Sequence, residues 1–212
     1  MKNIDLRNKL NLKKVNSGLQ NVISEWKIAV PLILSLIGLF VGTVITKGEE
    51  SLYSKAGYYI NNFLLNDYNY TFYIRLVINL LIPSIFSFIM FFLGLSVYGG
   101  LIVSLLPFTF TLFSGIITYY MFSEYTLKGL AYCVIMLFPY LTLALYALIV
   151  TSGECITMSQ YLLCTLSVKR IKAPDYSIKN YYLNVIKAYI IIVIAALVKT
   201  LIEGLFVGLF RF

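Results

Sequence analysis

The sequence contains no histidine, and this absence removes several kinds of active site at once. Ser–His and Cys–His pairs need an imidazole to activate the nucleophile, and many zinc enzymes use histidine as a ligand. The sequence also lacks a P-loop and a dinucleotide-binding glycine motif. Its nine carboxylates lie mostly in polar segments between apolar ones. We therefore expect neither catalysis by this chain alone nor a cofactor.

Cysteine is scarce, and its three positions do not have the spacing of metal ligands. Cys133, Cys155 and Cys164 lie in or beside apolar segments. We expect them to be reduced thiols that pack as small apolar side chains, and we expect no metal site.

Charge is absent from the whole of residues 76–122. As one helix, this stretch would extend roughly 70 Å, whereas the hydrocarbon core of a bilayer is about 30 Å thick. The stretch must therefore cross twice, and Tyr98-Gly99-Gly100 predicts the turn between the two crossings. With 60% hydrophobic residues, 12% charged residues and a mean hydropathy of +0.85, the chain is typical of an integral membrane protein.

We predict an all-α polytopic membrane protein, a kinked bundle of about five transmembrane helices that form a single domain, 28–212. The apolar runs that define the spans are approximately 28–46, 76–97, 101–122, 129–151 and 183–210. Between them lie a tyrosine-rich outer loop, 47–75, with a short interfacial helix predicted at 56–65, and a cytoplasmic amphipathic segment, 152–182. Residues 152–168 are either a helical extension of the fourth span or an interfacial helix.

Basic residues predict the orientation. The predicted inner segments, 1–27 and 152–187, hold eleven of the seventeen Lys and Arg residues, and the predicted outer segments hold five. Because Lys and Arg accumulate on the cytoplasmic side, the N-terminus should be cytoplasmic and the C-terminus outside. The net charge of +8 follows from this bias and needs no nucleic-acid partner. The residue usage suggests an AT-rich bacterial genome, and hence the bacterial cytoplasmic membrane.

Two basic segments are candidates for contact with the lipid surface. Residues 1–27 predict a basic amphipathic cytoplasmic helix with apolar residues at helical spacing, although a frayed basic tail is the alternative. The segment 152–182 ends in a second basic cluster. The residues expected to contact anionic headgroups are Lys9, Lys13, Lys14, Lys169, Arg170 and Lys172.

Each of the first four spans contains one proline. Pro31 lies in a first turn, where the missing N–H costs little. Pro83, Pro107 and Pro139 lie within their spans and should kink the helices and free carbonyl groups one turn upstream. In lipid these carbonyls need partners from neighbouring helices, which predicts a packed bundle.

Lys199 and Glu203 are the most distinctive polar residues of the last span. They are four residues apart and therefore share one helix face. A charge at the bilayer centre costs roughly 2.5–3.5 kcal/mol on an insertion scale, so such residues usually face the bundle interior and pair. One interpretation is an ion pair that locks the span into the bundle. The other is a functional role, as part of a substrate path or a docking site.

Three further positions complete the set of candidate packing residues. Asn79, near the start of the second span, can hydrogen-bond across helices. Gly204 and Gly208 form a G-x-x-x-G pattern that permits close helix approach, within the chain or in a homo-oligomer. Ordinary packing is the alternative for these glycines.

From residue 70 to residue 210 the pattern resembles the stage II sporulation protein M family. Asn79 precedes the glycine-bearing segment 91–100, Gly115 lies in the third span, and Pro139 follows the segment 127–130. The last span, 195–204, reads Ala-Ala-Leu-Val-Lys-Thr-Leu-Ile-Glu-Gly, similar to the closing segment of the family. The family often has another polar residue where this chain has Tyr140.

This resemblance implies a non-enzymatic multi-span protein that organises envelope or cell-wall-remodelling partners. The best-known member acts in engulfment during sporulation, where it assembles with cell-wall hydrolases. More distant members are similar to membrane subunits of ATP-driven exporters, which makes a permease-like subunit with a separate ATPase the alternative. A third option is another small five-span family, such as the Yip-type trafficking proteins.

Overall fold

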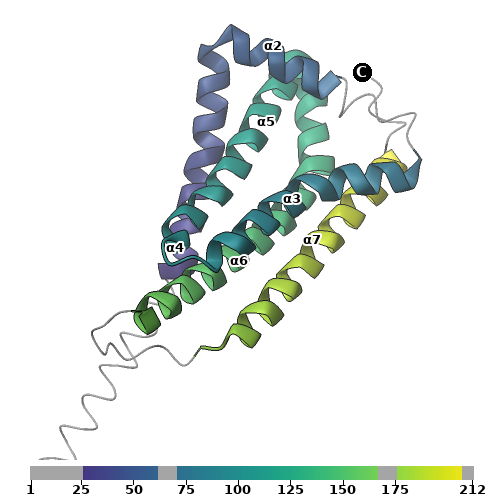
Figure 1. Ribbon diagram of the computed structural model, residues 1–212. Coiled ribbons are helices and arrows are strands. Elements are labelled where there is room, and N and C mark those ends of the chain that lie inside the picture. The colour runs from purple at the N-terminus through teal and green to yellow at the C-terminus, as the bar shows by residue number, and fades with distance from the viewer. Residues whose placement is uncertain (1–25, 62–70, 167–175, 207–212) are drawn as a thin grey trace, which may run out of the picture.

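The computed structural model describes residues 26–61, 71–166 and 176–206, and every element in these ranges is helical. The first helix covers Trp26–Gly48. It is followed by α2 (Glu50–Tyr59), α3 (Phe72–Gly94), the short α4 (Gly99–Val103), α5 (Leu105–Tyr132), a π-helical turn η3 (Cys133–Leu137), α6 (Phe138–Leu166) and α7 (Ile178–Phe206). Figure 1 shows α2 lying across one end of the bundle, while the long helices run away from it.

Four stretches of the described chain are long and apolar enough to cross a membrane: Trp26–Gly48, Phe72–Gly94, Gly99–Leu166 and Ile178–Phe206, with mean hydropathies between 2.3 and 2.6. The third is 68 residues long. At 1.5 Å per residue it would extend about 100 Å as one straight helix. It does not run straight, because it contains a reversal.

The reversal lies at Thr126, inside α5. Thr126 has φ 49° and ψ −123°, and it is the only non-glycine residue with positive φ in the described ranges. A Cβ on Gly129 would lie 1.8 Å from the Met121 carbonyl oxygen, so the chain passes too close to itself there for a side chain. The structure therefore has four to five long apolar helices, depending on whether the two arms are counted separately. The short connection expected between the third and fourth spans lies here.

The core is formed by α3, α6 and α7. Helices α6 and α7 pack extensively against each other, and α3 packs against both. Small residues make this close packing feasible, because they let helix backbones approach. Those that are fully buried include Ala144, Ala147, Ala195 and Ala196.

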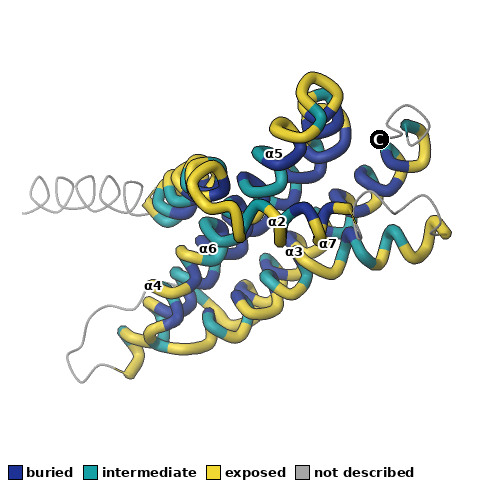
Figure 2. Tube along the Cα trace, turned by 90° about the horizontal axis from the view of Figure 1, so that it is seen from above, coloured by how far each residue is buried: buried dark blue, intermediate teal, exposed yellow. Residues whose placement is uncertain are grey.

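The outer faces are apolar. Many large apolar side chains of the first helix, α3 and α7 are exposed, such as Phe40 (68%) and Phe88 (64%). Figure 2 shows exposed residues along the outer faces and buried residues on the faces that helices turn toward one another. Soluble monomers rarely expose apolar surface so extensively, and the pattern suits contact with lipid.

Several helix boundaries differ from the boundaries predicted for the spans. The second span begins at Phe72 and ends at Gly94, and α4 begins at Gly99, so the turn predicted at 98–100 occupies 95–98. The interfacial helix predicted at 56–65 is α2, Glu50–Tyr59. The last helix begins at Ile178 and not near 183.

The largest correction concerns 152–182. Residues 152–166 continue α6 without a break, which is the first of the two interpretations. Ser152, Cys155 and Ser159 are buried, and the Ser159 hydroxyl donates to the Val97 carbonyl at 2.7 Å and accepts from the Gly100 N–H at 3.1 Å. Cys155 and Ser159 thus make hydrogen bonds inside the bundle, and the region is not a separate surface helix.

Candidate functional site

Asn79 and Glu203 meet in the interior, where α3 packs against α7. Both are buried, with 4% and 3% of their surface exposed. The Asn79 side-chain amide donates to Glu203 Oε2 at 2.8 Å and lies 3.2 Å from the Thr200 hydroxyl. Two residues selected from the sequence for separate reasons are therefore partners. Their hydrogen bond is among the stronger kinds in a protein, because its acceptor is a charged group.

Lys199 completes the charge balance of this cluster. Its Nζ lies 3.4 Å from Glu203 Oε1, one turn along the same helix, and 4.9 Å from the centre of the Tyr140 ring. Lys199 is itself 6% exposed. A buried ammonium next to a carboxylate and an aromatic face is neutralised within the protein, as a residue at membrane depth requires.

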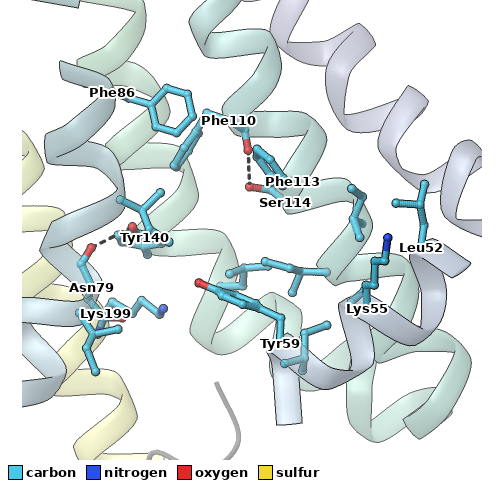
Figure 3. A pocket seen from close by; sticks show the side chains of 17 residues that line it. Leu52, Lys55, Tyr59, Asn79, Phe86, Phe110, Phe113, Ser114, Tyr140 and Lys199 are labelled. Carbon is cyan, nitrogen blue, oxygen red and sulfur yellow. Dashed lines mark hydrogen bonds between the residues drawn. The ribbon is translucent and has the colours of Figure 1, made fainter. Parts of the chain in front are cut away.

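Tyr140 joins α6 to the same cluster. Its hydroxyl donates to the Asn79 backbone carbonyl at 3.0 Å, which Figure 3 draws as a dashed line. This is the carbonyl that Pro83, four residues later, leaves without its helical partner. The predicted need for a partner from a neighbouring helix is met here by a side chain in α6.

Pro139 places Tyr140. The proline follows the π-helical turn η3, in which the Phe138 N–H bonds to the Cys133 carbonyl. The wider turn accommodates a residue that cannot donate, and it changes the direction in which the next residue points. We call the set Asn79, Tyr140, Lys199, Thr200 and Glu203 the polar cluster.

A cavity of about 450 Å³ lies beside the polar cluster. Seventeen residues from α2, α3, α5, η3, α6 and α7 and the residue after α2 line it, most of them apolar. Figure 3 shows Phe86 and Phe110 at one end, and Tyr59, Lys55 and Lys199 nearer the other. The cavity is therefore amphipathic, with an apolar end and with one lysine on each of two opposite sides.

The G-x-x-x-G pattern of the last span was predicted to permit close helix approach, but Gly204 makes no close contact with another helix. A Cβ there would meet nothing within 4 Å, and Gly208 lies outside the described residues. The close approach that such glycines permit occurs elsewhere, between the first helix and α5. A Cβ on Gly42 would lie 2.3 Å from the Leu112 carbonyl oxygen, and one on Gly38 would lie 2.4 Å from the Phe108 carbonyl oxygen. The spacing of Gly38 and Gly42 was the signal that could have found it.

A second polar group, also missed from the sequence, lies at the other end of the bundle. The Tyr176 hydroxyl donates to the Glu154 carboxylate, and the Lys27 ammonium donates to the Thr157 hydroxyl at 3.1 Å. Burial raises the pKa of Tyr176 above its ordinary value, and the bond to Glu154 raises it further. These contacts hold the residues before α7 and the start of the first helix to α6.

The remaining predicted residues have no place in this site. The basic residues expected at the lipid surface all lie outside the described residues: Lys9, Lys13, Lys14, Lys169, Arg170 and Lys172. Within the described ranges, Cys133, Cys155 and Cys164 are free thiols, and His, Cys, Asp and Glu form no group of three that would hold a metal ion.

Comparisons with known proteins gave no match: no family model, no curated protein and no solved structure is significantly similar to this chain.

Proposed function

We propose that the chain crosses a bacterial cytoplasmic membrane five times, with the N-terminus in the cytoplasm and the C-terminus outside. The reversal at Thr126 supports five passes, because it divides the 68-residue apolar stretch into two arms, each of them long enough to span the membrane. The excess of Lys and Arg in 1–27 and 152–187 supports the orientation. In this arrangement α2 lies at the outer surface.

We propose that the protein is a non-enzymatic membrane scaffold that binds envelope or cell-wall-remodelling proteins, as its resemblance to the stage II sporulation protein M family implies. The observation that carries this proposal is that the contacts of the polar cluster connect three helices. Glu203 is paired with Lys199 and bonded to Asn79, so these buried groups connect α3 with α7, and Tyr140 connects them with α6. Such a cluster fixes helices relative to one another, which a docking platform needs.

The outer surface offers the docking face. In α2, one side packs on α5, where the Tyr53 ring lies 5.1 Å from the Tyr120 ring and the Tyr53 hydroxyl donates to Glu124 at 2.7 Å. The opposite side is exposed, and Tyr58 has 71% of its surface accessible. Exposed tyrosines contribute large contact area at low entropic cost, so this face suits a protein partner.

Site-specific photocrosslinking in cells tests the scaffold proposal. A photoreactive amino acid at Tyr58 should capture an envelope protein with a domain outside the membrane. The matched control is Tyr98, in the α3–α4 turn at the opposite end, which is 77% exposed. Crosslinks to such a protein from Tyr58 and not from Tyr98 are the expected result; no crosslink from Tyr58 in functional protein would contradict the proposal.

A permease-like subunit of an ATP-driven exporter is the second candidate, and the cavity beside Lys199 favours it. A substrate in that cavity would meet the buried ammonium. This function requires a separate ATPase to purify with the chain and to be lost when residues 1–25 are deleted. Absence of any associated ATPase would exclude it, and transport by the purified chain alone in liposomes would exclude the scaffold instead.

A further inference from the structure

The cavity beside the polar cluster has an uneven distribution of charge. Among the residues that the structure describes, its lining includes two ammonium groups, those of Lys55 and Lys199, and no carboxylate. Glu203 is not part of the lining but balances Lys199 at 3.4 Å. The site therefore has a net charge of about +1, from the exposed Lys55 at its rim, and this charge favours a ligand with a single negative charge.

The apolar part of the cavity suits an acyl chain. The Phe86 and Phe110 rings close one end, with centroids 5.8 Å apart, and isoleucines from α3 and α5 line the walls. A volume of about 450 Å³ lies within the roughly 300–1,000 Å³ that is usual for ligand pockets. A small polar solute would leave these walls without partners, whereas a hydrocarbon chain would cover them.

The cavity also reaches the surface that faces lipid. Ile82 of α3 and Phe113 of α5 both line it, and 39% and 59% of their surfaces are exposed. A lipid chain would enter between these two helices without crossing water. In the proposed orientation, α2 and Lys55 lie at the level of the outer headgroups, so a lipid of the outer leaflet would have its headgroup next to Lys55.

We propose that this cavity is a binding site for an anionic phospholipid of the outer leaflet. The acyl chain occupies the space between α3 and α5, and the headgroup phosphate lies beside Lys55, within reach of the Tyr59 side chain. The proposal rests on the membrane placement proposed above. It goes beyond the scaffold function, because it assigns a ligand to a site that the scaffold function does not require.

Native mass spectrometry of the full-length protein in detergent tests this site. The probes are phosphatidylglycerol, which has one negative charge, and phosphatidylcholine, which has none, supplied in equal amounts. Phosphatidylglycerol should be retained in preference. A lysine near an anionic lipid contributes about 1 kcal/mol, so Lys55→Gln should reduce the ratio of bound phosphatidylglycerol to phosphatidylcholine about fivefold. Lys47→Gln is the matched control, because Lys47 is also exposed but does not line the cavity.

A second variant tests the cavity itself. Ser114 is buried, lines the cavity and donates only to the Phe110 carbonyl of its own helix, so Ser114→Phe would fill the space without removing a contact between helices. It should reduce retention of both lipids, whereas Thr142→Phe, at an exposed position of α6 whose hydroxyl donates to the Pro139 carbonyl of its own helix, should not. If Ser114→Phe fails to fold, judged by size-exclusion chromatography, the Lys55 comparison decides alone.

Three results would overturn the proposal: equal retention of the two lipids by the unchanged protein, equal effects of Lys55→Gln and Lys47→Gln, or unchanged retention in a folded Ser114→Phe variant. Lipid retention is measured on purified protein without partners. A failure of the lipid-binding proposal is therefore distinct from a failure of the scaffold proposal, which the crosslinking experiment tests.

Discussion

The Tyr140 hydroxyl lies 3.0 Å from the Asn79 carbonyl oxygen and supplies the hydrogen bond that Pro83 removes from α3. A break in one helix is thus repaired by a side chain from another. The same asparagine uses its amide to bond Glu203 in α7. One residue therefore holds three helices in register, and this arrangement yields direct tests.

Removing the Tyr140 hydroxyl should destabilise the bundle. Tyr140→Phe keeps the ring that faces Lys199 and leaves a buried carbonyl without a partner, which costs about 1–3 kcal/mol. We expect a lower thermal unfolding midpoint in detergent. Pro83→Ala restores an N–H for that carbonyl, so the hydroxyl should matter less in that background. If Tyr140→Phe lowers the unfolding midpoint equally with and without Pro83, the Tyr140 hydroxyl does not replace the hydrogen bond that Pro83 removes.

The Lys199–Glu203 pair should behave as a unit. Glu203→Gln leaves the Lys199 ammonium buried without its counter-ion, a change that typically costs 3–5 kcal/mol in proteins. Lys199→Met combined with Glu203→Gln removes both charges and keeps an amide for Asn79, so the double variant should be more stable than Glu203→Gln alone. Unfolding in a denaturing detergent measures this order. A double variant that is no more stable than Glu203→Gln would show that the two charges are not coupled. If Glu203→Gln instead loses function while its level in the membrane stays normal, the carboxylate has a functional role.

Glycines should differ in their tolerance of a methyl group according to what lies next to them. Gly42→Ala would place a Cβ 2.3 Å from the Leu112 carbonyl oxygen, so the first helix and α5 would have to separate. Overpacking of this kind typically costs about 1–3 kcal/mol. Gly204→Ala is the control, because nothing lies within 4 Å of the added atom. Equal stability of the two variants would exclude the close contact.

Tyr176 should make stability depend on pH in the alkaline range. Burial and the bond to Glu154 raise its pKa in the folded protein above the ordinary value near 10, whereas the unfolded chain has the ordinary value. The stabilisation is therefore fully present below pH 10 and is lost as the pH rises through the folded pKa. Tyr176→Phe should flatten this decline relative to the unchanged protein between pH 9 and about 12. If the stability of Tyr176→Phe falls with pH as steeply as that of the unchanged protein, the Tyr176 hydroxyl does not cause the decline.

Much of the fold follows from the sequence, because lipid imposes strong constraints. Charge-free runs of helical length predicted the helices, and the expense of intramembrane polar groups directed attention to Asn79, Lys199 and Glu203. Which of these groups meet depends on the register of α3 against α7. That register is set by packing across the whole interface, so it could not be read from either segment.

Two features lacked a local signal. The predicted spans placed the connection between 122 and 129, but the reversal inside it has a β-branched residue at φ 49° where a glycine would be expected, so Thr126 itself was not predictable from turn residues. The composition of 152–166 could not decide between an extension of the fourth span and an interfacial helix, because the segment mixes apolar and polar residues. The structure shows the extension, in which Cys155 bonds to the Met90 carbonyl of α3, and Ser159 bonds to Val97 in the turn before α4 and to Gly100 of α4.

Cysteine labelling in intact cells tests the five-pass arrangement most directly. In a background with Cys164→Ser, which keeps the buried Cys133 and Cys155, one cysteine would be introduced at a time, at Ser51, Leu127 or Tyr98, and treated with a membrane-impermeant maleimide. All three positions are exposed. The account predicts labelling at Ser51 and Leu127 from outside, and labelling at Tyr98 only after the membrane is made permeable. Labelling of Tyr98 and Leu127 from the same side of an intact membrane would contradict it.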